Sequence, residues 1–238
     1  SPSSYLETNI GGTLNVLQAA HDFGVSRLVH TSTSEVYGSA QFVPISEEHR
    51  LQGQSPYSAS KIGTDQLAYS FACSFETPVV TVRPFNTFGP RQSMRALIPT
   101  IIKQLGTGSP ELRLGALHPT RDFTFVKDTV AGFQLAATSN LDPGVVINLG
   151  TNFEISVRDT AKTIAEIMGV DVKFIQENQR KRPRLSEVTR LRADNSLAST
   201  LLGWAPQRFG MDGFRWGLER TVEWFKAPRN LARYREGS

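Results

Sequence analysis

The chain has 238 residues, of which 39% are hydrophobic and 20% are charged. This balance is ordinary for a folded globular protein and excludes the disordered and fibrous classes. The net charge of +4 is modest. The densest basic run, residues 180–184, has no interleaved aromatic side chains, so we expect no nucleic-acid partner, and a solvated loop or a phosphate-binding patch at that run.

Two further kinds of protein are excluded by the residue pattern. No apolar run approaches the roughly 20 residues that cross a bilayer, and the first five residues lack the pattern of a signal peptide. We therefore expect a cytoplasmic protein with no membrane partner.

The single cysteine, Cys73, forms no internal disulfide, and the four histidines lack metal-ligand spacing, so neither a disulfide nor a metal site is expected.

Helical and strand periods alternate along the chain, which is typical of an α/β fold. A helix is predicted at about 5–23, then a buried strand at 27–31, a helix at 57–75 and a β-branched strand at 79–82. This strand–helix–strand unit predicts two parallel, neighbouring strands. Further helices are predicted at 96–105, 128–138, 157–168, 196–202 and 211–225, with a strand pair at 112–114 and 123–126 and a strand at 145–148.

A glycine-rich phosphate-binding turn is not found in the sequence. Dinucleotide-binding sheets open with a strand and a Gly-x-Gly-x-x-Gly turn whose amides receive a pyrophosphate. The chain has neither this pattern nor its Gly-x-x-Gly-x-x-Gly variant, and it begins in a predicted helix. We expect it to be a fragment of a longer protein or a natural truncation.

Tyr57 and Lys61 are the most informative pair. They are four residues apart, twenty-four residues after the hydroxyl-rich run Thr31-Ser32-Thr33-Ser34-Glu35-Val36-Tyr37-Gly38. If the segment from Tyr57 is helical, the two side chains share a face. The ammonium is then expected to favour the phenolate, which turns a weak acid into a usable base.

With these residues the chain resembles an extended short-chain dehydrogenase/reductase of the nucleotide-sugar epimerase and dehydratase group. The resemblance follows the family's order over nearly the whole chain. Its motifs are Asn9 with Gly12-Thr13, Thr31 to Gly38, Tyr57 with Lys61, Arg83 to Pro90, Arg121 to Phe123, Asn148 to Gly150, and Arg184 ahead of Glu187 and Ala193-Asp194.

The resemblance implies a Rossmann-like doubly wound parallel sheet, truncated at its N-terminus, with a small mixed α/β C-terminal substrate lobe. The expected division is 1–90 and 119–156 for the cofactor domain, 91–118 and 157–226 for the substrate lobe, and 227–238 for a loose tail. It also implies NAD or NADP as cofactor, a nucleotide-diphosphate sugar as substrate, and a homodimer joined by a four-helix bundle.

The resemblance assigns roles residue by residue. The expected catalytic residues are Thr33, Ser34, Glu35, Tyr57 and Lys61. The expected cofactor contacts are Ser32, Tyr57, Lys61 and Pro84. The expected substrate contacts are Thr33, Asn86, Arg121 and Arg184. No metal is expected.

Within the family, Ser34-Glu35 resembles the 4,6-dehydratases, in which a glutamate serves as the base at C5 after oxidation at C4. The glucose-type dehydratases have an aspartate where Ser34 stands, so the proton donor for the lost water, Ser34 or protonated Glu35, stays open. Two alternatives to a 4,6-dehydratase are a 4-epimerase of the same family and a noncatalytic sugar-nucleotide or partner-binding protein with a lost cofactor loop.

Each candidate also has a structural interpretation. Thr33 and Ser34 are hydroxyl residues of the kind that satisfy backbone groups at a strand end. Glu35 has the alternative of a solvated surface carboxylate. Asp122 either orients Arg121 or bonds to backbone.

Overall fold

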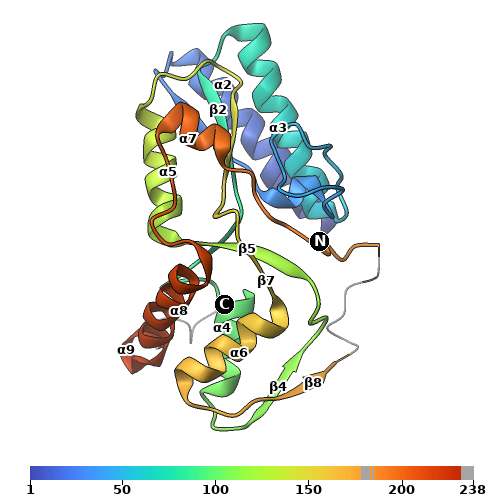
Figure 1. The fold of residues 1–238 in the computed structure, drawn as a ribbon. Helices are drawn as coiled ribbons and strands as arrows, with labels where there is room; N and C mark the ends of the chain where they lie inside the picture. The colour runs from blue at the N-terminus through green and yellow to red at the C-terminus, as the bar shows by residue number, and fades with distance from the viewer. Residues whose placement is uncertain (178–182, 184, 232–238) are drawn as a thin grey trace.

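The computed structural model describes residues 1–177, 183 and 185–231. Two lobes are visible in Figure 1, an upper one around a parallel sheet and a lower one around helices and short strands. The elements of the upper lobe are α1 (Pro2–Tyr5), the π-helical segment η1 (Leu6–Gly11), α2 (Gly12–Asp22), β1 (Leu28–Thr31), the 3-10 turn η2 (Ser34–Tyr37), α3 (Pro56–Phe75), β2 (Val79–Pro84), α5 (Val126–Thr138), β6 (Val146–Leu149) and α7 (Ser196–Leu202).

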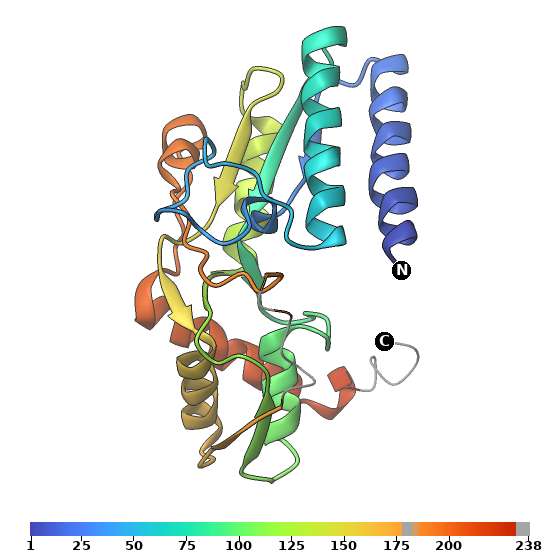
Figure 2. The same ribbon diagram turned by 90° about the vertical axis from the view of Figure 1, so that its right-hand side faces the viewer.

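The sheet of the upper lobe has the strand order β1-β2-β6, with both pairs parallel. Leu28 lies opposite Val79, and Thr81 lies opposite Val146. Successive residues of β2 point to opposite faces, and both faces are covered, because Val79 packs with α2 and α3 whereas Val80 packs with α5 and α7 (Figure 2). This double coverage explains why the strands are rich in apolar residues. The predicted α/β fold with parallel neighbouring strands is confirmed.

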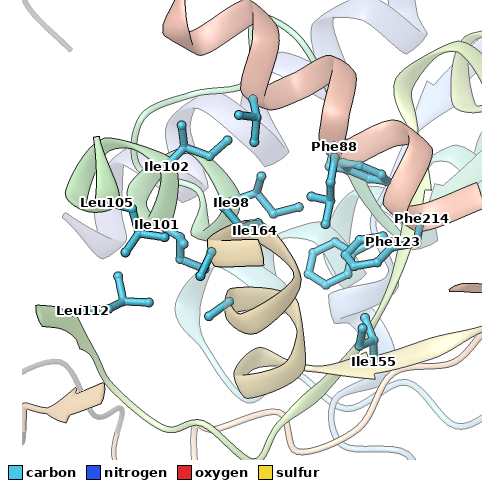
Figure 3. Packing of buried hydrophobic residues seen from close by; sticks show 14 of the residues in the cluster. Phe88, Ile98, Ile101, Ile102, Leu105, Leu112, Phe123, Ile155, Ile164 and Phe214 are labelled. Atoms are coloured by element: carbon cyan, nitrogen blue, oxygen red, sulfur yellow. The ribbon is translucent and has the colours of Figure 1, made fainter. Parts of the chain in front are cut away.

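The lower lobe is organised around a second core (Figure 3), to which Phe88, Ile98, Phe123, Ile164 and Phe214 belong. Its elements are α4 (Leu97–Leu105), β4 (Glu111–Leu114), α6 (Val157–Met168), β8 (Lys173–Gln176), α8 (Gly210–Lys226) and α9 (Pro228–Leu231). The strands β3 (Asn86–Phe88), β5 (Thr120–Phe125) and β7 (Glu154–Ser156) form a third sheet, in which β5 is the central strand.

One predicted strand pairing and parts of the expected division into lobes differ from the structure. The predicted strand pair at 112–114 and 123–126 is wrong, since β4 pairs with β8, and β5 pairs with β3 and β7. Phe123 and Phe125 pack in the lower core, while Ala198 and Leu202 of α7 pack on the upper sheet. Within 119–156, expected in the cofactor domain, β5 thus packs in the lower core while α5 and β6 pack in the upper lobe. Helix α7 packs in the upper lobe although 157–226 was expected in the substrate lobe.

The C-terminal segment is also more ordered than expected within the described residues. Residues 228–231 form α9, and the Asn230 side chain donates a 2.9 Å hydrogen bond to the carbonyl of Trp224 in α8. The start of the expected loose tail is therefore wrong, and residues 232–238 lie outside the described part.

Candidate active site

The N-terminus of α3 is fixed by a reciprocal cap. The Ser55 hydroxyl accepts from the backbone N–H of Ser58 at 3.1 Å, the Ser58 hydroxyl accepts from the N–H of Ser55 at 3.0 Å, and Pro56 opens the helix. Both donors would otherwise be unsatisfied at a helix start. Tyr57 therefore lies in the first turn of a defined helix, and the prediction that it and Lys61 belong to one helix is confirmed.

The hydroxyl-rich run leaves the end of β1 and turns beside α3. Thr33 is extended, and its side-chain oxygen accepts from the N–H of Glu35 at 3.2 Å, which caps the turn η2. Ser34 is 3% exposed, whereas Glu35 is only half-buried. Gly38 closes the turn at φ 65°, a conformation that suits glycine.

A surface pocket of about 310 Å³ lies where this turn meets α3. We call it the Tyr57 pocket, and its lining residues are Tyr5, Glu35, Ser55, Pro56, Tyr57 and Ser186. Glu35 and Tyr57 therefore share one opening to solvent. Glu35 supplies the carboxyl in this lining, and Thr33 and Ser34 are not part of it.

The electrostatics of Tyr57 differ from the sequence expectation. Burial raises the pKa of its phenol, the Glu35 charge raises it further, and a hydrogen bond with Thr33 lowers it, with a net upward shift. The Lys61 ammonium donates a 2.6 Å hydrogen bond to the carbonyl of Thr31. The net shift of the Tyr57 pKa is thus upward, opposite to the direction expected from a neighbouring ammonium.

Lys61 faces a second cavity of about 380 Å³ along the free edge of β1. Asn9, Thr13 and Thr31 also line this cavity. Burial lowers the pKa of the Lys61 ammonium, and the charge of Asp65, one helical turn further along α3, opposes that shift. The lysine thus lies between a cavity of mixed polar and apolar lining and the protein interior.

Behind Lys61 lies a set of charged and polar side chains that the sequence did not predict. We call it the buried network, and it consists of His30, Tyr37, Asp65, Arg83 and Asn148, each at most 9% exposed. Asp65 accepts from Arg83 Nε at 2.9 Å and lies 3.3 Å from His30 Nε2. Arg83 also donates to the Tyr37 hydroxyl at 2.9 Å, and that hydroxyl donates to Asn148 Oδ1 at 2.7 Å.

The buried network shifts the pKa values of its own members. Burial acts to raise the pKa of Asp65, but the His30 hydrogen bond and the Arg83 charge outweigh it and hold that pKa below its usual value. Burial raises the pKa of Tyr37 to about 12 despite Arg83. One sequence signal pointed to this network, namely a charged residue, Arg83, next to the end of the valine-rich strand β2.

The expected cofactor contacts lie at the same ends of two adjacent strands. Ser32 directly follows β1, and its N–H donates to the carbonyl of Val82 in β2 at 2.8 Å. Pro84 is the last residue of β2 and lies opposite Leu149 of β6. In open parallel sheets, ligands bind outside this carboxyl edge.

The expected substrate contacts are more scattered. The side-chain oxygen of Asn86 is buried without a hydrogen-bond partner among the described residues. Arg121 donates to the carbonyl of Thr120 at 2.8 Å and lies 3.6 Å from the Glu187 carboxylate. Arg184 lies outside the described residues.

Asp122 bonds to backbone and does not orient Arg121. Its carboxylate accepts from the N–H and hydroxyl of Thr151 at 2.8 and 2.7 Å, and from the N–H groups of Asn152 and Ala193 at 3.0 and 3.1 Å. Burial raises its pKa to about 6 in spite of these bonds. This residue therefore joins three segments of chain.

Within the described ranges, no helix is both long and apolar enough to span a membrane. The same residues contain no cluster of three or more His, Cys, Asp or Glu side chains that could hold a metal ion.

The chain has a parallel sheet covered on both faces, and a tyrosine and a lysine lie one turn apart at the start of a helix beside it. This combination defines the class as a short-chain dehydrogenase/reductase. Comparison with known proteins agrees. The family model described as GDP-mannose 4,6 dehydratase matches residues 1–214. The chain therefore belongs to the nucleotide-sugar epimerase and dehydratase family.

Relatives of both reaction types are similar to the chain. A dTDP-glucose 4,6-dehydratase of Streptomyces antibioticus is 31% identical over 96% of this chain and 66% of its own length. A UDP-glucose 4-epimerase of Mycolicibacterium smegmatis is 31% identical over 92% of this chain and 68% of its own length. The chain thus spans about two thirds of the length of these curated relatives.

A solved structure gives the same fold. The dTDP-glucose 4,6-dehydratase DesIV of Streptomyces venezuelae, determined with NAD bound, superposes with a TM-score of 0.84 at 30% identity, covering 97% of this chain and 69% of that one. The predicted family is confirmed, and the comparisons do not separate dehydratase from epimerase.

Proposed function

We propose that this protein is a nucleotide-sugar 4,6-dehydratase, which converts a nucleotide-diphosphate hexose to its 4-keto-6-deoxy form. One observation carries the proposal: Glu35 and Tyr57 line the same pocket, and the Glu35 charge acts on the Tyr57 phenol. Elimination of water from C5 and C6 needs a second base close to the first. A 4-epimerase has no such task for a carboxylate.

The cofactor that fits is NAD or NADP. Lys61 uses one N–H for Thr31 and faces a cavity, so its remaining donors suit ribose hydroxyls. Ser32, Tyr57, Lys61 and Pro84 would hold the nicotinamide end. When bound, the oxidised cofactor would supply the hydride acceptor and a positive charge.

The chain's own residues would then divide the proton transfers. Tyr57 takes the proton from the sugar 4-hydroxyl, while Thr33 donates a hydrogen bond to that oxygen. The resulting 4-ketone acidifies the hydrogen at C5, and Glu35 removes it. Protonated Glu35, a lining residue of the pocket, then gives its proton to the departing 6-hydroxyl, which leaves as water. The enone that remains would take back the hydride at C6 and a proton at C5, which gives the 4-keto-6-deoxy sugar and restores the oxidised cofactor.

Substrate binding would rest on Arg121 and Asn86. An arginine fork suits a diphosphate, and the unpartnered oxygen of Asn86 can accept from a sugar or base donor. The neighbouring solved structures include a UDP-N-acetylglucosamine 4-epimerase of Methanobrevibacter ruminantium in complex with a UDP-sugar. This supports a nucleotide-sugar ligand here.

We also propose a homodimer through α2 and α3. Several large apolar side chains on these helices are exposed, namely Leu14 at 43%, Tyr69 at 54% and Phe75 at 52%. Phe71 of α3 is not available for this contact, because it is 6% exposed in the core of the upper lobe. A monomeric mass of the full-length protein by light scattering at tens of micromolar would contradict the dimer.

Product analysis tests the reaction. The full-length protein with NAD is incubated with a panel of UDP-, GDP- and dTDP-hexoses, and the products are weighed by mass spectrometry. A dehydratase gives a product lighter by one water molecule. A product of unchanged mass with inverted C4 would assign a 4-epimerase, and binding without any product would assign a noncatalytic protein.

A further inference from the structure

One wall of the Tyr57 pocket comes from a distant part of the chain. Ser186 lines the pocket together with Glu35 and Tyr57. The next residue, Glu187, lies 3.6 Å from the guanidinium of Arg121. The stretch 185–187 therefore contacts both the proposed reaction centre and the proposed diphosphate-binding arginine, so its position sets the distance between them.

Little apolar packing holds this stretch in place. Leu185 is 80% exposed, and the first buried residue that follows is Val188, at 4% exposure. From there on the chain is anchored by backbone bonds, such as the 3.0 Å bond from Thr120 N–H to the Thr189 carbonyl. Polar contacts must therefore hold residues 185–187 in place.

The side chain of Gln54 supplies the contact at the start of this stretch. Its amide nitrogen donates a 2.8 Å hydrogen bond to the carbonyl of Leu185. Its amide oxygen accepts a 2.5 Å hydrogen bond from the N–H of Ser39. The Ser39 hydroxyl in turn donates to the Glu187 carbonyl at 3.3 Å and accepts from the Thr189 N–H at 3.1 Å.

Gln54 is also joined directly to the catalytic helix. The next residue, Ser55, caps α3 two positions before Tyr57. Gly38 permits the close approach, because a Cβ at this position would lie 2.7 Å from the Gln54 amide oxygen. One side chain thus links the cap of α3, the turn after η2 and the stretch 185–187.

We propose that Gln54 is a positioning residue that fixes the wall 185–187 relative to the N-terminus of α3, and thereby sets the affinity for the nucleotide sugar. The proposal rests on the proposed function of the Tyr57 pocket. Gln54 itself does not line that pocket. It acts through the hydrogen bonds to Leu185 and Ser39.

Three variants of the full-length protein separate this role from a general effect on folding. Gln54→Ala removes both hydrogen bonds. Gln54→Glu keeps an acceptor for Ser39 but places a carboxylate oxygen against the Leu185 carbonyl, so it breaks only the link to the wall. Gln52→Ala is the matched control, because Gln52 is an exposed glutamine two residues earlier with no side-chain hydrogen bond among the described residues.

Two readouts are used. Hydrogen–deuterium exchange of peptides covering 185–191 measures the wall directly and needs no substrate. Steady-state kinetics with the nucleotide sugar turned over by the unaltered enzyme measures KM and kcat. We expect faster exchange in both Gln54 variants and a KM increase of about tenfold with kcat changed less than about threefold, because loss of a hydrogen bond that only holds the binding wall weakens binding uniformly.

The outcomes are distinct. Unchanged exchange at 185–191 in Gln54→Ala, or faster exchange with KM as in the unaltered enzyme, would overturn the proposal. So would an equal KM effect of Gln52→Ala. If the unaltered enzyme turns over no nucleotide sugar, the proposed function fails instead, and the exchange measurement still decides whether Gln54 holds the wall.

Discussion

Tyr37 and Tyr57 both have a raised pKa, but they lie in contrasting surroundings. Tyr37, in the buried network, is fully covered, and its hydroxyl is bonded to Arg83 and Asn148. Tyr57, in the Tyr57 pocket, is half-buried and shares a solvent opening with Glu35. A tyrosine with all its hydrogen bonds satisfied inside the protein stabilises the fold, whereas one beside a solvated carboxylate stays available for proton transfer.

The two regions meet on α3. Tyr57 faces the pocket in the first turn, Lys61 follows one turn later, and Asp65 enters the buried network after one more turn. Along α3, the groups therefore change from half-buried ones at the pocket to a fully buried one in the network. The comparison predicts that substitutions at its start change chemistry, while those further along change stability.

The largest expected effect is on catalysis by Tyr57→Phe. Removal of the proposed base at the sugar 4-hydroxyl should slow the first step by about a hundredfold or more, because general base catalysis typically contributes this much. The melting temperature should change little, since the Tyr57 hydroxyl is at the pocket surface. Tyr37→Phe is the contrasting variant, and it should lower stability by about 1–3 kcal/mol because it leaves buried partners unsatisfied. A stable Tyr57→Phe enzyme with full activity would contradict the proposed role of Tyr57 in proton transfer.

The next effect concerns stability. Asp65→Leu leaves the guanidinium of Arg83, a residue 4% exposed, without its carboxylate. Breaking a buried ion pair from one side costs about 3–5 kcal/mol, which urea unfolding monitored by circular dichroism would measure. Glu219→Gln, at a carboxylate whose side chain is 43% exposed, is the control and should cost less than about 1 kcal/mol. Equal losses in both variants would remove the distinction between buried and exposed charges.

Asp122 gives a pH-dependent test in a third region. Burial raises its pKa from 3.8 to about 6, so between these values the folded protein binds a proton that the unfolded chain does not. The stability contribution of this carboxyl is therefore largest at acidic pH and is lost as pH rises through about 6, by about 3 kcal/mol in all. Asp122→Asn should remove that part of the pH dependence in urea unfolding between pH 4 and 7. An identical pH dependence in the variant would show that Asp122 does not titrate in this window.

The smallest expected effect is electrostatic. Because the Glu35 charge raises the pKa of Tyr57, Glu35→Gln should lower that pKa and shift phenolate formation to lower pH. Ultraviolet difference titration measures the shift, and the double variant with Tyr57→Phe identifies which tyrosine is responsible. No change of the Tyr57 titration would show that the two groups do not interact across the pocket.

The long helices and the Tyr57–Lys61 motif could be predicted from the sequence, but the direction of the Lys61 side chain could not. The predicted helices at 157–168 and 196–202 coincide with α6 and α7, because their apolar periods and glycine stops are strong local signals. The short strands β3, β7 and β8 went unpredicted, since three or four residues carry too little periodicity. Spacing placed Lys61 on the helix of Tyr57 but did not show that its ammonium bonds to the Thr31 carbonyl.

The assignment of Glu35 is tested most directly by a single-turnover experiment on the Glu35→Gln enzyme. Reduced nicotinamide is followed by its near-ultraviolet absorbance, beside exchange of the sugar C5 hydrogen in heavy water. If Glu35 is the base at C5, oxidation at C4 still occurs in the variant, while C5 exchange and water release slow by about a hundredfold or more. Exchange and water release at the unaltered rate would contradict the dehydratase assignment of Glu35 and favour a 4-epimerase.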